Sequence, residues 1–155
     1  MEERISHADR AEALFRQGYN CAQAVFAAFC DVTGMDEKTA LMLSSPFGGG
    51  MGRMREVCGT VSGMFMALGS LYGYDSGDAK EEKAELYAEV RALADRFREE
   101  NGGTIICREL LPKAMQGGNG EPTPRTEEFY HARPCVRYVR AAADIFDDFL
   151  SSHRR

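Results

Sequence analysis

The stretch EVCGTVSGMFMALGSLYG, residues 56–73, is apolar on nearly all sides when it is read at helical spacing. A helix without a polar face belongs inside a domain, where other elements cover it. We therefore predict that residues 56–73 form the central helix of the fold.

The segments on both sides of this stretch have the pattern of amphipathic helices. Apolar residues recur three and four positions apart, and residues that favour helix ends delimit each run. The residues expected to begin helices are Ser6, Asn20, Asp36, Thr104 and Pro134. The predicted helices cover residues 7–17, 21–34, 37–45, 76–103, 105–115 and 135–153.

No segment shows a convincing polar–apolar alternation, which is the pattern of a half-buried strand. The chain has no internal repeat and no linker that would divide it. The expected fold class is all-α: residues 1–155 form a single domain, a bundle of six or seven helices with a buried central helix.

The composition limits the function classes. The chain has 155 residues, of which 44% are hydrophobic, enough for the core of one domain. Its net charge is −5 and no basic stripe stands out, so nucleic acid is not an expected partner. The charged start MEERISHADRAEALF is not a secretory signal, and no apolar run is long enough to cross a bilayer. We expect a cytoplasmic protein without membrane insertion.

Five cysteines need an explanation, because stable disulfides are uncommon in the cytoplasm and cysteines there bind metal, react or pack. Cys30 lies in the apolar run of its predicted helix and is interpreted as a core residue. The other four fall in the first turn or so of four different predicted helices: Cys21, Cys58, Cys107 and Cys135.

A helix start presents unpaired N–H groups and the positive end of the helix dipole, which favour thiolate over thiol. Arginines stand near three of the four cysteines and add positive charge: Arg53, Arg55, Arg108, Arg133 and Arg137. We predict that the four thiols are biased toward the thiolate form and gather into one reactive site. The alternative is that they are packing residues at helix ends.

The glycine-rich loop PFGGGMGRMR, residues 46–55, directly precedes Cys58. Glycines allow a backbone with positive φ, and successive N–H groups in such a loop can hold a thiolate, a cluster sulfide or an oxidised sulfur. A plain flexible turn is the alternative. The candidate cofactor-binding residues are Gly48, Gly49, Gly50, Gly52, Arg53 and Gly59.

A nucleotide is not expected at this loop. The loop lacks the G-x-x-x-x-G-K-[ST] motif, and Arg55 stands where the last glycine of G-x-G-x-x-G should be. No predicted strand precedes the loop either, as both nucleotide motifs would require.

Four segments resemble the C_GCAxxG_C_C family of redox-active proteins: NCAQAVFAAF, FGGGMGRMREVCGTVSG, CRELL and CVRYVRAAADI. The resemblance covers about residues 15–147. Cys21, Cys58, Cys107 and Cys135 fall on the family's four cysteine positions, and Gly59 and Gly63 fall on its glycines. Thr60 stands where the family has alanine, a change that we expect not to touch the thiols.

The resemblance implies a small bacterial or archaeal protein, often encoded near transporters, with redox chemistry. A similar cysteine arrangement stands beside the iron–sulfur site of split-Soret cytochromes. This chain has no C-x-x-C-H motif, so covalently attached haem is not implied.

Three function classes follow. The first is thiol/disulfide redox chemistry, an oxidoreductase-type activity carried by Cys21, Cys58, Cys107 and Cys135. The second is an iron–sulfur cluster or metal ion held by the same four cysteines. The third is a non-catalytic accessory protein. The expected partners are a redox partner protein, a transporter-associated protein or a second copy of this chain in a homodimer.

Overall fold

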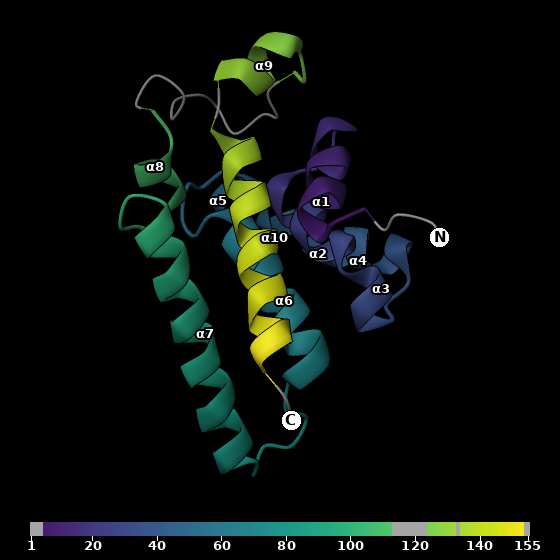
Figure 1. Cartoon of the computed structure of the whole chain (residues 1–155), viewed down its shortest axis with the longest axis vertical. Helices are drawn as coiled ribbons and strands as arrows, with labels where there is room; N and C mark the ends of the chain where they lie inside the picture. Colours follow the sequence, from purple (N-terminus) through teal and green to yellow (C-terminus); the bar gives the residue numbers. More distant parts are fainter. Residues whose placement is uncertain (1–4, 113–123, 133, 154–155) are drawn as a thin grey trace.

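The computed structural model describes residues 5–112, 124–132 and 134–153, and confirms the all-α fold class (Figure 1). The helices of eight residues or more in these ranges are α1 (His7–Arg16), α2 (Cys21–Ala28), α4 (Glu37–Ser44), α6 (Gly59–Tyr72), α7 (Lys80–Glu100) and α10 (Cys135–Ser152). Shorter elements are α3 (Cys30–Thr33), the 3₁₀ helix η1 (Ser45–Phe47), α5 (Gly48–Met51), α8 (Cys107–Leu110) and α9 (Glu127–Ala132). None of the described helices is long and apolar enough to span a membrane.

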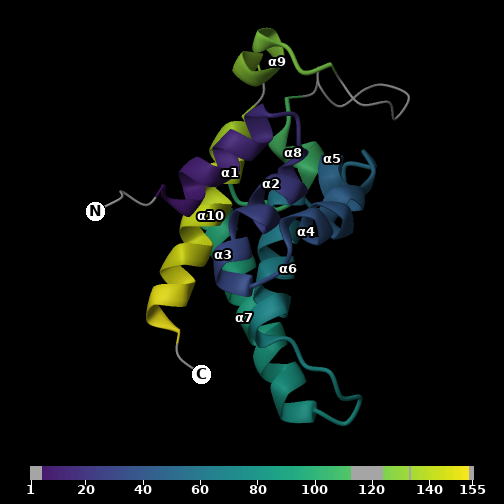
Figure 2. The ribbon, with the colours of Figure 1, turned by 90° about the vertical axis from the view of Figure 1, so that its right-hand side faces the viewer.

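The centre of the fold is the pair α2 and α6, whose N-terminal halves pack closely together. Most of α6 is buried, as its sequence predicts, and α2 is buried even more completely. Helix α10 packs along both α6 and α7, and Figure 2 shows α6 and α7 extending together away from the cluster of α1, α2, α4 and α5. The largest fully buried side chains include Phe26, Phe29, Phe97 and Phe146.

Three predicted helix caps are confirmed. Ser6 Oγ accepts from the Asp9 N–H at 3.0 Å and begins α1. Asn20 forms a complete capping box with Gln23 at the start of α2. The Asp36 side chain accepts from the Thr39 N–H at 3.1 Å and caps α4. Short polar side chains therefore fix where these helices begin.

Several predicted helix boundaries are wrong. Helix α6 begins at Gly59 instead of residue 56, and α7 begins at Lys80 instead of residue 76. The helix expected over residues 21–34 breaks at Phe29, whose φ and ψ are −102° and 15°, so Cys30 begins a new short helix. Cys30 is half-buried against the core rather than enclosed in it. Ile106, not Thr104, occupies the N-cap of α8, which ends at Leu110.

Candidate functional site

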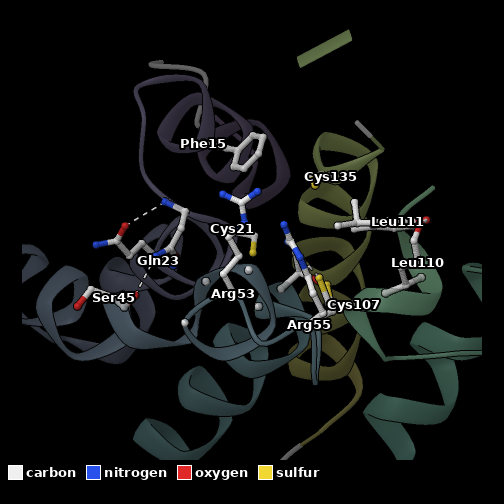
Figure 3. A pocket seen from close by; sticks show the side chains of 18 of the residues that line it. Phe15, Cys21, Gln23, Ser45, Arg53, Arg55, Cys107, Leu110, Leu111 and Cys135 are labelled. Atoms are coloured by element: carbon white, nitrogen blue, oxygen red, sulfur yellow. Dashed lines mark hydrogen bonds between the residues drawn. The ribbon is translucent and has the colours of Figure 1, made fainter. Parts of the chain in front are cut away.

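A cavity of about 460 Å³ opens among the start of α2, the glycine loop, α8 and the start of α10 (Figure 3). All four cysteines that the sequence singles out are among its lining residues, and each is the first residue or the N-cap of its helix. No disulfide joins the described cysteines. Their joint action as one site stays a prediction.

Cys21 is placed by the cap of α2 and by the glycines of α6. Asn20 caps α2 and also donates from Nδ2 to the Ser45 carbonyl at 3.0 Å, which anchors α2 to η1. A Cβ on Gly59 would overlap Cys21 Sγ, and a Cβ on Gly63 would lie 2.7 Å from the Ala22 carbonyl oxygen. Small residues therefore let the start of α2 reach α6.

A short antiparallel contact joins the segments that carry Cys58 and Cys107. An isolated β-bridge pairs Val57 with Ile106. The Cys58 N–H donates to the Ile105 carbonyl at 2.8 Å, and the Cys107 N–H donates to the Glu56 carbonyl at 2.6 Å. The backbone thereby holds two cysteines that are far apart in the sequence at the two ends of one bridge.

Cys135 begins α10, and Tyr138 secures that end of the helix. The Tyr138 side chain is 6% exposed, and its hydroxyl donates to the Leu110 carbonyl at 3.0 Å. This hydrogen bond ties the start of α10 to α8, so that Cys135 and Cys107 border the same cavity.

The glycine loop forms a tight left-handed turn, with the positive φ that its glycines predict. Residues 49–53 all have positive φ, between 58° and 70°, including the non-glycine residues Met51 and Arg53. L-residues with side chains adopt this region at a cost, so glycine is favoured at the remaining positions.

Most candidate cofactor-binding residues of the loop face the cavity. Its lining includes Gly48, Gly49, Gly52, Arg53 and Gly59. Gly50 does not line it and lies behind, where a Cβ would come within 2.7 Å of Cys107 Cβ. Gly50 is therefore required for packing against Cys107.

The predicted bias toward thiolate is wrong for Cys21 and Cys58. Burial raises the pKa of the Cys21 thiol, although the backbone N–H of Gly49 at the sulfur lowers it in part. Burial also raises the pKa of Cys58, and the charges of Cys21 and Cys107 raise it further. The loss of water around each sulfur raises its pKa by more than the helix dipole and the loop amides lower it.

Thr60 contacts a thiol, contrary to expectation. Its Oγ1 lies 3.1 Å from Cys58 Sγ, and both side chains are buried. The Thr60 hydroxyl and backbone N–H lower the pKa of Cys58, against the larger effect of burial. Thr60, which stands where the family pattern has alanine, thus lowers the pKa of Cys58, one of the four family cysteines.

The arginines around the cysteines divide into two groups. Arg53 and Arg55 project from the loop into the cavity (Figure 3), and Arg55 Nη1 lies 3.7 Å from Cys107 Sγ. Arg108 instead forms an exposed salt bridge with Glu56, at 2.5 Å, and Arg137 is exposed outside the cavity. Arg133 lies outside the described residues.

Sequence reasoning missed Arg125, which also lines the cavity. Its guanidinium donates to the Phe15 and Tyr19 carbonyls and stacks over the Phe15 and Phe129 rings, 4.6 Å from each centroid. In the sequence Arg125 stands beside a polar loop. No neighbouring residue indicates that its side chain reaches the C-terminal end of α1.

The ligand set for a metal ion is not assembled in the described part of the chain. No three side chains of His, Cys, Asp or Glu come close enough there to hold a metal ion. Tetrahedral thiolate coordination needs four sulfurs around one point at about 2.3 Å from the metal. The cavity as described offers separate thiols and backbone amides rather than such a sphere.

The family model described as "Putative redox-active protein (C_GCAxxG_C_C)" matches residues 19–149. No match appears among curated proteins or among solved structures.

Proposed function

Because this chain belongs to the C_GCAxxG_C_C family, we propose that it is a thiol–disulfide redox protein whose cysteines act in one cavity. The observation that carries the proposal is that Cys21, Cys58, Cys107 and Cys135 all line this cavity. The charge of Cys21 affects the pKa of Cys58, and that of Cys107 affects both, which supports their proximity.

Cys21 is the proposed attacking thiol. Its side chain is half-buried, whereas Cys58 is only 6% exposed. The N–H groups of Gly49, Ala22 and Cys21 itself counter the effect of burial on its pKa. These donors stabilise the negative charge of the thiolate, the form that attacks a disulfide.

Cys58 is the proposed resolving thiol, and the electron acceptor is a small disulfide or a disulfide of a partner protein. The Cys21 thiolate attacks one sulfur of the acceptor, whose S–S bond breaks and releases one thiolate. Cys58 then loses its proton and attacks Cys21 Sγ, and the second acceptor thiolate leaves. Two electrons pass to the acceptor, and a Cys21–Cys58 disulfide remains.

Thiol counting tests this function. Metal-free reduced protein is treated with bis(2-hydroxyethyl) disulfide, and the free thiols are counted after denaturation, before and after renewed reduction. We expect a reversible loss of two thiols, with a Cys21–Cys58 peptide found by mass spectrometry. Cys30→Ser is the matched control, since Cys30 lies outside the cavity. This variant should lose the same two thiols as the wild type.

Two results would overturn the proposal. One is a full count of titratable thiols after oxidant treatment. The other is stoichiometric iron and sulfide in protein purified without oxygen, lost together when Cys21, Cys58, Cys107 and Cys135 are replaced by serine, which would favour an iron–sulfur protein instead.

A further inference from the structure

Arg55 is a buried cation with an unused hydrogen-bonding edge. Its side chain is 7% exposed, and its Nη1 points to Cys107 Sγ at 3.7 Å. Its Nε and Nη2 are buried and have no hydrogen-bond partner among the described residues. Burial of a charged group without partners is costly, so such a group indicates a ligand that completes it.

The two unpaired nitrogens are the ones that bind an oxyanion together. The N–H of Nε and one N–H of Nη2 point in the same direction and match the two oxygens of a carboxylate or similar group. Arg55 lines the same cavity as Cys21, Cys58, Cys107 and Cys135, so an oxyanion held by Arg55 would share the cavity with the cysteines.

The rest of the cavity also favours an anion. No Asp or Glu is among its described lining residues, although the chain as a whole carries a net charge of −5. Arg53 and Arg125 line it together with Arg55. The apolar part of the cavity wall includes Phe15, Leu110, Leu111 and Phe129. A volume of about 460 Å³ is of the size that holds a small molecule.

We propose that Arg55 binds the carboxylate, or an equivalent oxyanion group, of a small disulfide substrate, and so selects an anionic electron acceptor for the cavity cysteines. The apolar wall covers the carbon chain of the substrate, and the guanidinium fixes its charged end. This inference rests on the proposed function and names its substrate class.

Binding tests the site without any redox step. Reduced protein is titrated by calorimetry with thiodiglycolate, a dicarboxylate thioether that cannot exchange, and with sulfate. Thiodiglycolate should bind, and Arg55→Lys should weaken this binding by about tenfold or more. Lysine keeps the positive charge but lacks the two parallel N–H groups of the guanidinium. Arg108→Met is the matched control: Arg108 adjoins Cys107 but is exposed and does not line the cavity, so binding should be unchanged.

Each outcome of the titration decides the inference. Absence of thiodiglycolate binding to the wild type overturns it, and so does unchanged binding in Arg55→Lys that circular dichroism shows to be folded. Binding of sulfate alone also overturns it, in favour of a site for an inorganic oxyanion.

Rates with paired oxidants separate this inference from the proposed function. Dithiodiglycolate carries two carboxylates, and bis(2-hydroxyethyl) disulfide is a neutral compound of similar size. We expect the wild type to react about tenfold or more faster with the anionic disulfide, and Arg55→Lys to remove most of this preference. Equal rates with both oxidants overturn the anion selectivity and leave thiol exchange intact, whereas no reaction with either overturns the proposed function.

Discussion

Thr60 Oγ1 lies 3.1 Å from the Sγ atom of Cys58. Cys58 is the N-cap of α6, and Thr60 follows two residues later in the buried start of this helix. The family pattern has alanine at this position, so the hydroxyl is a feature of this chain. It lowers the pKa of Cys58, which burial raises. A single side chain thus adjusts the reactivity of the proposed resolving thiol.

Thr60→Ala should make Cys58 less reactive. Without the hydroxyl the pKa of Cys58 rises, so the thiolate fraction at pH 9 falls and alkylation by iodoacetamide slows by roughly three- to tenfold. Mass spectrometry of the Cys58 peptide over time measures this rate. Thr60→Ser keeps a hydroxyl and should react at nearly the wild-type rate. A faster reaction in Thr60→Ala would mean that better access to the sulfur outweighs the hydrogen bond.

Gly59→Ala should destabilise the protein, and Gly69→Ala in the same helix should not. A Cβ at Gly59 would overlap Cys21 Sγ and lie 3.0 Å from the Phe47 carbonyl oxygen, whereas a Cβ at Gly69 would meet nothing within 4 Å. We expect a loss of about 1–3 kcal/mol for Gly59→Ala and a gain of up to about 1 kcal/mol for Gly69→Ala. Urea denaturation of the reduced proteins measures both. Equal stabilities would show that α2 can move away from α6 at little cost.

The fold class and the helix start at Cys21 could be predicted because both depend on local patterns. The apolar surface of residues 56–73 marks a buried helix, and the short polar caps Ser6, Asn20 and Asp36 fix helix starts through bonds within three residues. Cys21 could be placed at a helix start for the same reason, because it follows the Asn20 cap. Cys58, Cys107 and Cys135 stand at helix starts that have no side-chain cap.

The electrostatics of the site could not be predicted, because they depend on contacts between distant segments. The backbone bridge of Val57 with Ile106 brings Arg55 to Cys107, while Arg108, the sequence neighbour of Cys107, turns outward to Glu56. Burial then reverses the thiolate bias that the helix dipole suggests for Cys58. Sequence adjacency is therefore a poor guide to which cation faces a thiol.

The left-handed turn of the glycine loop makes a separate prediction. Gly52 has a φ of 58° and open space around its Cα, so Gly52→Ala should cost about 1 kcal/mol, from backbone strain alone. Gly50→Ala should cost more, because its Cβ would also come within 2.7–2.8 Å of Cys107 Cβ and of the backbone of Arg55 and Glu56. Thermal unfolding of both variants measures the difference. A smaller loss for Gly50→Ala than for Gly52→Ala would contradict the described packing behind the loop.

The raised pKa of Cys58 should make the reduced protein less stable in alkaline solution. Unfolded Cys58 releases its proton near the ordinary thiol pKa of 9.0, whereas the folded state retains it to higher pH. Above pH 9 the folded state thus binds more protons than the unfolded state, and rising pH favours unfolding. The stabilising contribution of Cys58 is complete below pH 9 and is lost as the pH rises toward its folded pKa.

Comparison of the wild type with Cys58→Ala isolates this effect, because the other titrating groups are common to both proteins. Between pH 9 and 10.5, under reducing conditions, the free energy of unfolding of the wild type should fall more steeply, by up to about 1.4 kcal/mol per pH unit. Urea denaturation at several pH values measures the slopes. Parallel slopes would show that the Cys58 thiol is hydrated in the folded state, and a shallower wild-type slope would show a lowered pKa, which would restore the thiolate predicted from the helix start.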